Sequence, residues 1–255
     1  MTAWDEDPPP VRRLLSVSEE QPLWRIFPYK RAIQLFSQKQ LALVVPELWE
    51  DPFENFLRSC FVDVGSADEA GLYGLTNTFY GQCWTSAADE TDAMWRIYAP
   101  REERGIRLRV TAGRLFDVIY KADDQRSAVC CFLGEVQYLS EKELSAFVDS
   151  LVVSRDLLHS DGVAIARTLL KKRIQFAHEA EVRLLYSLAR ITDRTGSVLK
   201  FLCDPNLLIE HALLDPRWNS EEAEAATSAL RAAGYSGTVE QSTLYREPGK
   251  KALRL

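Results

Sequence analysis

The chain has 255 residues, of which 46% are hydrophobic and 27% charged, and its formal net charge is −6 at pH 7. This composition is typical of a globular protein with a packed core, and the negative charge argues against a protein that coats nucleic acid through bulk electrostatics. No apolar stretch approaches the length of a membrane-spanning helix, so we expect no membrane partner.

The first residues are acidic and then rich in proline, with Pro8, Pro9 and Pro10 in a row. Proline disfavours both helix and sheet, so residues 1–20 are predicted to form a flexible arm that lacks the pattern of a signal peptide. The five cysteines include no CxxC pair and their number is odd, which indicates reduced thiols. Together these features predict a cytoplasmic protein.

Residues 21–255 are predicted to form one domain that begins with alternating elements. Apolar patterns favour strands at 23–27, 41–45, 79–84, 105–110, 115–120 and 132–139. Helical spacing of apolar residues predicts a helix over 31–40, and a second helix over 90–99 would have Asp89 as its N-cap.

The second half of the chain begins with a predicted helical insertion near 141–175, made of helices over 141–158 and 162–175. Strands are expected at 182–188, 198–202 and 238–245, a helix at 221–233, and either a strand or a short helix at 207–214. This irregular interleaving favours a single α+β domain with a mixed, mostly antiparallel sheet and flanking helices over a doubly wound parallel sheet. No GxGxxG or phosphate-loop lysine motif supports the common nucleotide-binding folds.

Two carboxylates, Glu179 and Glu181, precede the apolar run over 182–188. Residues two apart in a strand point to the same face, so the pair is predicted to lie side by side and one pKa to be raised. Such a pair suits a site that stabilises developing positive charge or activates a hydroxyl group. Alternatively, the pair binds Lys172, Arg173 or Arg183 at a solvated strand end.

Arg25 lies between Trp24 and Ile26 in the first predicted strand of the domain. A guanidinium group at this position can clamp a phosphate at two points, or it can pair with a structural carboxylate. Asp51 and Glu54, from the acidic and aromatic loop over 49–54, are the carboxylates we expect to orient Arg25.

Thr85 and Ser86 end a predicted strand and precede a helix. Their hydroxyl groups can bond a ligand ribose, brace the two glutamates or cap the helix. On that helix, Trp95 and Tyr98 share a face and can stack on a base or a nicotinamide ring, or they belong to the core. The histidines are too dispersed for a zinc site, and no metal is expected.

Several short motifs occur in an order that resembles the bacterial domain of unknown function 2971 family. They are Asp51-Pro52-Phe53-Glu54, then Met94-Trp95 with Tyr98-Ala99 and Gly105, and finally Glu179-x-Glu181-x-Arg183. The resemblance covers roughly residues 23–245 and departs at Glu50, where the family often has asparagine. It implies little about activity.

A more distant resemblance is to ADP-ribosyltransferases, which build an NAD site in a split sheet from a first-strand arginine, a Ser-Thr-Ser strand and a Glu-x-Glu strand. It implies that Arg25 holds phosphate and that Thr85 and Ser86 support the site. Glu181 would bond the ribose 2′-hydroxyl and stabilise the oxocarbenium ion, and Glu179 would deprotonate the acceptor. Separately from this resemblance, we expect Arg183 to support the two glutamates without contacting the ligand. The chain lacks the first serine of the serine motif and inserts helices before Glu179.

We therefore expect an NAD-processing enzyme, either an ADP-ribosyltransferase or an NAD glycohydrolase, of the kind that acts as a toxin or an antiphage defence effector. Its acceptor would be a protein or a nucleic acid. The alternative is a non-catalytic module of a bacterial defence system that binds a nucleotide or a partner protein in the same pocket. A metal-dependent nuclease or other hydrolase is a third reading, but the sequence offers no clustered aspartates to support it.

Overall fold

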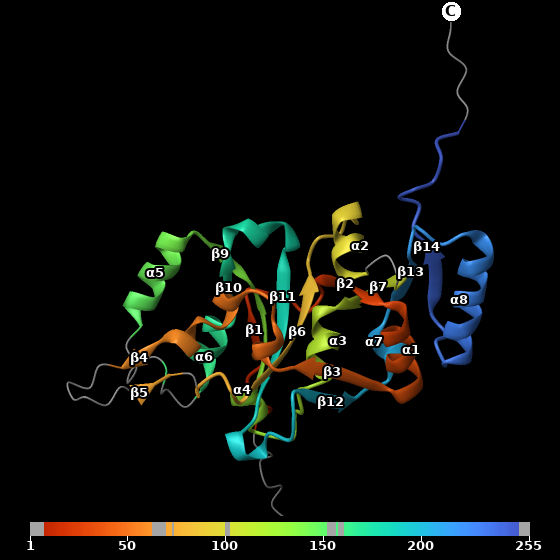
Figure 1. Cartoon of the computed structure of the whole chain (residues 1–255). Helices are drawn as coiled ribbons and strands as arrows, with labels where there is room; N and C mark the ends of the chain where they lie inside the picture. The colour runs from red at the N-terminus through yellow and green to blue at the C-terminus, as the bar shows by residue number, and fades with distance from the viewer. Residues whose placement is uncertain are drawn as a thin grey trace, which may run out of the picture.

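The computed structural model describes residues 8–62, 70–72, 74–99, 103–151, 157 and 161–249. Within these residues ten strands form one mixed sheet, in which eight strands follow the order β1-β8-β11-β6-β2-β7-β13-β14 and β3 joins β12 to β6 (Figure 1). The strands of this sheet are β1 (Arg13–Leu15), β2 (Pro22–Pro28), β3 (Gln40–Val44), β6 (Phe79–Thr85), β7 (Gly105–Thr111), β8 (Cys131–Glu135), β11 (Glu181–Ser187), β12 (Val198–Leu202), β13 (His211–Leu214) and β14 (Thr238–Gln241). Two short pairs lie apart, namely β4 (Phe61–Val62) with β5 (Ala70–Gly71) and β9 (Gln137–Leu139) with β10 (Lys171–Arg173).

In the large sheet, the pairs β1–β8 and β13–β14 are parallel, and the remaining pairs are antiparallel. The predicted class, a single α+β domain with a mixed and mostly antiparallel sheet, is therefore confirmed.

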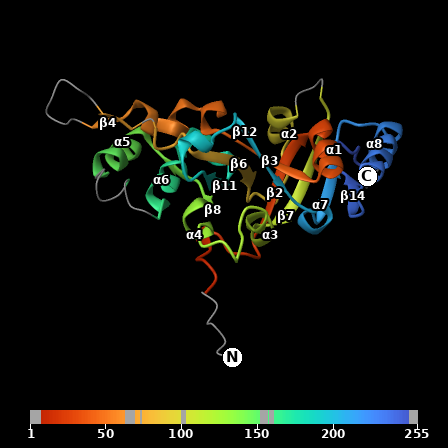
Figure 2. The ribbon, with the colours of Figure 1, turned by 90° about the horizontal axis from the view of Figure 1, so that it is seen from below.

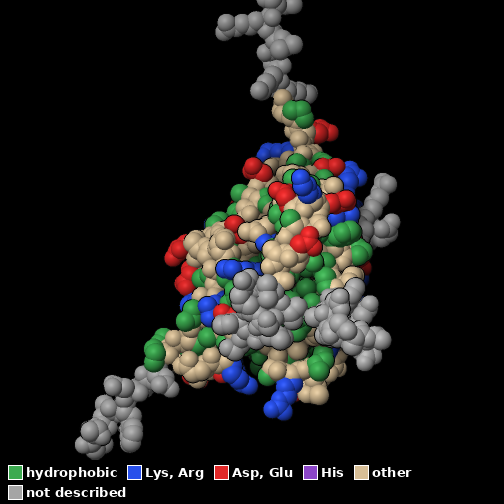
Figure 3. All heavy atoms as spheres, turned by 90° about the vertical axis from the view of Figure 1, so that its left-hand side faces the viewer, with side chains coloured by type: hydrophobic (Ala, Val, Ile, Leu, Met, Phe, Trp, Pro, Cys, Tyr) green, Lys and Arg blue, Asp and Glu red, His purple; other side chains and the backbone are tan. Residues whose placement is uncertain are grey.

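Helices flank the sheet at both of its ends. The helices are α1 (Tyr29–Gln38), α2 (Asp92–Tyr98), α3 (Ala112–Asp117), α4 (Ser127–Cys130), α5 (Glu141–Ser150), α6 (Val163–Thr168), α7 (Pro205–Leu208) and α8 (Ser220–Ala232), and the 3-10 turns are η1 (Pro46–Leu48), η2 (Pro52–Ser59), η4 (Ile174–Glu179) and η5 (Ile191–Asp193). Figures 1 and 2 place α1, α7 and α8 at one end and α5 and α6, with β4 and β5, at the other. No described helix is long and apolar enough to span a bilayer. At the end that carries α5, acidic and basic side chains are interspersed over the visible surface (Figure 3).

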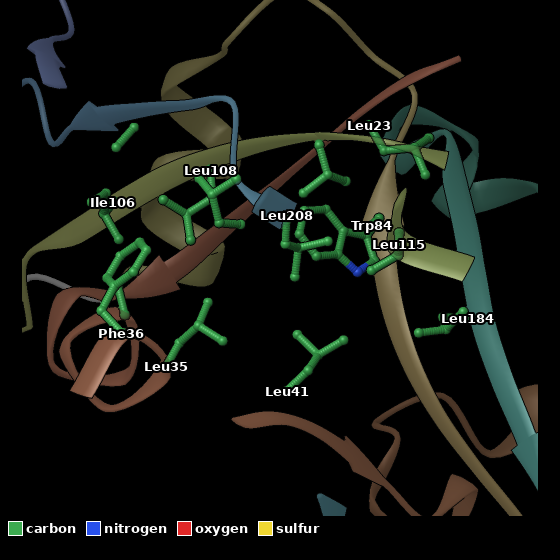
Figure 4. Close-up of a cluster of buried hydrophobic side chains, with 14 of the residues drawn as sticks. Leu23, Leu35, Phe36, Leu41, Trp84, Ile106, Leu108, Leu115, Leu184 and Leu208 are labelled. Carbon is green, nitrogen blue, oxygen red and sulfur yellow. The ribbon is translucent and has the colours of Figure 1, made fainter. Parts of the chain in front are cut away.

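One large apolar core lies on the face of the sheet that α1 and β3 cover (Figure 4). Because side chains alternate along a strand, one face of the central strands presents Leu23, Leu108, Trp84 and Leu184, all of which are buried. The opposite face is covered near β2 by α2, where Trp95 packs in a smaller cluster with Ile26, Met94 and Ala99.

The sheet opens between β2 and β6, at the centre of the strand order. These two strands share a single residue pair, Trp24 with Thr85, whereas β2 and β7 share seven pairs over Pro22–Pro28. Strand β3 likewise meets β6 only where Val44 lies opposite Gly81. Beyond these pairs the strands diverge, and their edges leave space for a cleft.

Several predicted elements need correction. The predicted arm over residues 1–20 contains β1, which pairs with β8 and is therefore ordered. The first half of the apolar run at 115–120 lies in helix α3 and the rest in the turn that follows it, not in a strand, because Ala112, Leu115, Phe116 and Ile119 are buried at helical spacing. Helix α2 begins after Thr91, whose Oγ1 accepts a hydrogen bond from Met94 N at 3.2 Å, so Asp89 is not its N-cap.

The predicted helical insertion is also shorter than expected. Helix α5 ends at Ser150, and the helix expected over 162–175 stops at Thr168, since Lys171–Arg173 pairs with β9 as β10. Most of the segment after residue 151 and before residue 161 lies outside the described residues. The strand expected over 132–139 is broken into β8 and β9, and the region 207–214 contains both α7 and β13.

Candidate functional site

A cleft of about 570 Å³ lies where β2 leaves β6. Its walls come from β2, β6, α1, β3, β12, α2 and the loop over 87–90. Consecutive residues line it in both β2 (Trp24–Pro28) and β6 (82–85), so both faces of the two strands contribute to the cleft. The volume falls within the usual range for sites that hold a small molecule.

Glu179 and Glu181 both line this cleft and are both buried. They do not share a strand as predicted, because Glu179 is the last residue of η4 and Glu181 is the first residue of β11. Ala180 between them adopts a left-handed conformation with φ 43°. This turn brings both carboxylates onto the same partner, the ammonium group of Lys172.

Lys172 lies among three carboxylates. Its Nζ is 2.8 Å from Oε1 of Glu181 and 2.7 Å from Oε1 of Glu54, and it also donates a hydrogen bond to Glu179. Arg183 completes the cluster, since its Nε is 2.7 Å from Oε2 of Glu181 and its Nη2 is 3.2 Å from Glu54. The expected ion pairs with Lys172 and Arg183 therefore form, but in the interior and not at a solvated strand end.

The environment separates the pKa values of the two glutamates. Burial and a hydrogen bond with Glu181 raise the pKa of Glu179 to about 7, although Lys172 opposes the shift. Burial alone would also raise the pKa of Glu181, but Arg183, the hydrogen bond with Glu179 and Lys172 outweigh it and lower this pKa to about 2. At neutral pH Glu181 is an anion, and Glu179 is close to half-protonated.

Thr85 and Ser86 brace the turn that carries the glutamates. Thr85 Oγ1 donates to the carbonyl oxygen of Glu179 at 2.6 Å, and Ser86 Oγ and N both donate to the carbonyl oxygen of Ala180, at 3.1 and 2.9 Å. Thr85 also lines the cleft and lies opposite Glu181 in the sheet. Of the three uses expected for these hydroxyl groups, the structure therefore contains the bracing one.

Arg25 lines the cleft from β2. Its guanidinium group lies 4.6 Å from the centre of the Phe27 ring, and its Nη1 is buried without a hydrogen-bond partner among the described residues. No described carboxylate forms an ion pair with it, and burial lowers the pKa of Arg25. A buried cation with an unused donor suits an anionic ligand.

The expectation that Asp51 or Glu54 orients Arg25 is wrong. Asp51 accepts from Arg173 at 3.0 Å and from the backbone N of Phe53 at 3.1 Å, where it caps η2. Glu54, one turn further along η2, contacts Lys172 and Arg183. Turn η2 packs against β10 and so directs its acids toward the cations of β10 and β11, away from β2.

The two aromatic residues expected to stack on a ligand have different positions. Trp95 is fully buried, donates from Nε1 to Glu90 at 2.7 Å and does not line the cleft, because its ring fills the core beneath α2. Tyr98 does line the cleft. The second aromatic wall is Trp24, whose ring lies 5.1 Å from the guanidinium carbon of Arg107.

Sequence reasoning missed Trp24 and Arg107 as cleft residues and treated Lys172 only as a surface partner. The sequence contains a signal for the first two, since both alternate with core residues along their strands and so face away from the main core. It contains none for Lys172, which reaches Glu54 only through the folding of η2 against β10. Tyr138, whose hydroxyl accepts from the backbone N of Glu181 at 2.8 Å, was also missed.

The three carboxylates around Lys172 do not form a metal site. Among the described residues, no group of three or more His, Cys, Asp or Glu side chains has an arrangement that could hold a metal ion. The position that a cation would take between Glu54, Glu179 and Glu181 belongs to the Lys172 ammonium group.

No family model matches the chain, so membership of the domain of unknown function 2971 family stays a prediction. No curated protein matches it either. Among solved structures the chain is similar to DarT from Thermus sp. 2.9 in complex with ADP-ribosylated ssDNA, with carba-NAD+ and with NAD+. The identities are 10%, 10% and 11%, and the TM-scores are 0.40, 0.38 and 0.35.

These matches cover 91%, 88% and 89% of this chain and 98%, 97% and 98% of the DarT chains. At identities and TM-scores this low, the likeness assigns no function to this chain.

Proposed function

We propose that this protein is an NAD-processing enzyme of the ADP-ribosyltransferase type, which breaks the bond between nicotinamide and ribose. The observation that carries the proposal is the buried pair of Glu179 and Glu181, with separated pKa values, on a cleft that is also lined by Arg25, whose buried Nη1 has no hydrogen-bond partner among the described residues. A role as a toxin or as an antiphage effector belongs to the same proposal.

Glu181 is the group we assign to the transition state. When the glycosidic bond breaks, nicotinamide leaves with the electron pair and the ribose becomes an oxocarbenium ion. An anionic carboxylate beside that ribose stabilises charge that is fully present only in the transition state, and it can accept a hydrogen bond from a ribose hydroxyl. The low pKa of Glu181 supports this role, since the side chain remains ionised at neutral pH.

Glu179 is the group we assign to the acceptor. Water or a nucleophilic group of a macromolecule attacks the cationic carbon of the ribose and must lose a proton as the new bond forms. A carboxylate with a pKa near 7 can take that proton at neutral pH.

The remaining cleft residues fit a dinucleotide. Arg25 would bind the pyrophosphate through its unused Nη1, and the rings of Trp24 and Tyr98 would contact the nicotinamide or adenine base. Thr85 and Ser86 would act indirectly, by holding the turn that carries the two glutamates.

The first prediction concerns Glu181→Gln. This variant keeps the shape of the side chain but removes its charge, so we expect nicotinamide release from NAD to fall about 10²–10³-fold. Release should be measured by chromatography, and NAD binding by calorimetry. Glu240→Gln, which changes an exposed glutamate in β14 away from the cleft, is the matched control. Normal turnover by folded Glu181→Gln would exclude the assignment.

One observation favours the alternative of a non-catalytic nucleotide-binding module. Both carboxylate oxygens of Glu181 already contact cations, Oε1 on Lys172 and Oε2 on Arg183, as in a structural ion-pair cluster. In that case wild-type protein would bind NAD or ADP-ribose without releasing nicotinamide. The two assays above therefore separate the enzyme from the module.

A further inference from the structure

The acid cluster beside the cleft is buried and nearly balanced in charge. Three carboxylates, Glu54, Glu179 and Glu181, face two cations, Lys172 and Arg183, and none of these side chains is more than 9% exposed. With every group ionised the cluster has one excess negative charge, and a single added proton makes it neutral.

Lys172 is the member that connects the others. It contacts all three carboxylates, whereas the ion pairs of Arg183 join only Glu54 and Glu181. Lys172 is also the only cation in direct contact with Glu179 among the described residues. Its position comes from β10, which pairs with β9 and packs against both η2 and η4.

We propose that Lys172 is a positioning residue, which holds Glu179 and Glu181 at one point and fixes the number of protons that the pair carries. The inference rests on the proposed function, because it concerns how the same two glutamates act. Lys172 touches neither substrate nor cofactor in this role, since its Nζ is surrounded by the carboxylates.

Removal of the ammonium group would leave the cluster with too little positive charge. Three buried carboxylates would then share Arg183 alone, and like charges at such short range cannot all stay ionised. The cluster would bind extra protons at neutral pH, and Glu181 would lose part of the charge that the proposed reaction uses. With Lys172 in place, the state of Glu179 alone decides whether the cluster is neutral or has an excess negative charge.

The other titratable and charged groups that act on the pair come from four elements. They are Tyr98 of α2, Tyr138 of β9, Cys83 of β6 and, more distantly, Arg25 of β2. Burial raises the pKa of each of the two tyrosines and of Cys83, so all three stay neutral near pH 7. None of them can replace the positive charge of Lys172.

The test compares Lys172→Met with Lys172→Arg, and uses Lys171→Met as the control. Lys171 is the neighbouring buried lysine of β10, but it contacts Gln137 and lies outside the cluster. The carboxyl groups of Glu179 and Glu181 are followed by carbon-13 NMR from pH 2 to pH 9 in protein labelled at glutamate, without NAD. Nicotinamide release is measured over the same variants as a pH profile.

We expect the pair to titrate in two well-separated steps in wild-type protein and in Lys171→Met. In Lys172→Met both steps should move up by about one to three pH units, and Lys172→Arg should return both steps most of the way to their wild-type positions. The pH profile of NAD turnover should shift toward higher pH together with these two steps. Unchanged titration in folded Lys172→Met would overturn the inference.

The inference can still be tested if Lys172→Met does not fold or if wild-type protein does not turn over NAD. If Lys172→Met does not fold, nitrogen-15 NMR of the Lys172 ammonium group in wild-type protein serves instead, and the absence of a shift in step with Glu179 would also overturn the inference. If wild-type protein has no NAD turnover, the proposed function fails, while the NMR titration still decides the role of Lys172.

Discussion

Glu181 is a buried carboxylate that lines the cleft and has a charged partner for each of its two oxygens. One oxygen contacts Lys172, the other contacts Arg183, and its backbone N donates to Tyr138. These contacts fix the plane of the carboxylate, so its direction into the cleft is set before any ligand binds. A group that does not have to reorient is the kind that electrostatic catalysis requires.

A second prediction at the scale of single residues concerns Arg183. Its side chain is completely buried, and it also donates to the carbonyl oxygen of Leu169 at 2.7 Å and lies 4.4 Å from the Trp49 ring. Arg183→Met leaves Glu54 and Glu181 with one cation fewer, so the free energy of unfolding should fall by about 3–5 kcal/mol. Urea unfolding followed by circular dichroism measures it.

The control for Arg183→Met is Arg126→Met, which removes an exposed arginine of the loop before α4 and should leave the unfolding free energy close to that of wild type. Equal stability of Arg183→Met and wild type would mean that the ion pairs of Arg183 with Glu54 and Glu181 contribute nothing to folding.

The identity of the acid pair could be predicted from the sequence, but most of its partners could not. Two glutamates before an apolar strand are visible locally, and so is an arginine in an alternating strand. The partners of Glu54 and Lys172 depend on the packing of η2 against β10, which brings together residues more than a hundred positions apart. For Trp95 the sequence allows either stacking on a ligand or a place in the core, because spacing identifies the shared face of a helix but not what that face contacts; the structure places it in the core.

At the scale of elements, strand β6 links the two sides of the site. It pairs along its whole length with β11, which carries Glu181, and it meets β2, which carries Arg25, at one residue only. Thr85 lies at that meeting point and also holds η4 through the Glu179 carbonyl oxygen.

The prediction at this scale is that Thr85→Val loosens the turn that carries Glu179. The substitution keeps the shape but removes the donor to the Glu179 carbonyl, so the protein should lose about 1–3 kcal/mol of unfolding free energy. Nicotinamide release should fall more than NAD binding does. Thr111→Val, in β7 away from the cleft, is the control for the loss of a hydroxyl group. Full activity in Thr85→Val would show that the brace does not matter for the reaction.

Most elements that build the cleft were predictable, because β2, β6, β7 and β11 have strong apolar patterns. The sequence predicts a strand where helix α3 lies, since a short apolar run fits the period of a strand as well as that of a helix. The burial of Ala112 and Ile119, which identifies the helix, is visible only in the folded structure. Strand β1 has no local signal at all, because it exists through its pairing with β8, far along the chain.

At the scale of the whole molecule, the acid pair should give the stability a recognisable pH dependence. The pKa of Glu179 is raised from 4.5 to about 7 in the folded protein, so its contribution to stability is full below pH 4.5 and decreases as the pH rises to about 7. The pKa of Glu181 is lowered to about 2, so its contribution is full above pH 4.5 and is lost as the pH falls to about 2. The pair therefore stabilises the protein most near pH 4.5.

Denaturant unfolding of wild type and Glu179→Gln across pH 3–9 tests this dependence. The difference in unfolding free energy between the two proteins should change between about pH 4.5 and 7 and be flat above that window. A flat difference across the whole range would mean that Glu179 titrates normally in the folded protein.

Strand β1 has a consequence for how the polypeptide can be shortened. Its three residues occupy the outer hydrogen-bonding side of β8, opposite Phe132, Leu133 and Gly134. A version trimmed to begin at Pro22 would leave β8 as an exposed edge strand, and exposed edge strands can pair with strands of neighbouring copies. With only three residues, β1 is a poorer template for such pairing than the longer β8 that it covers.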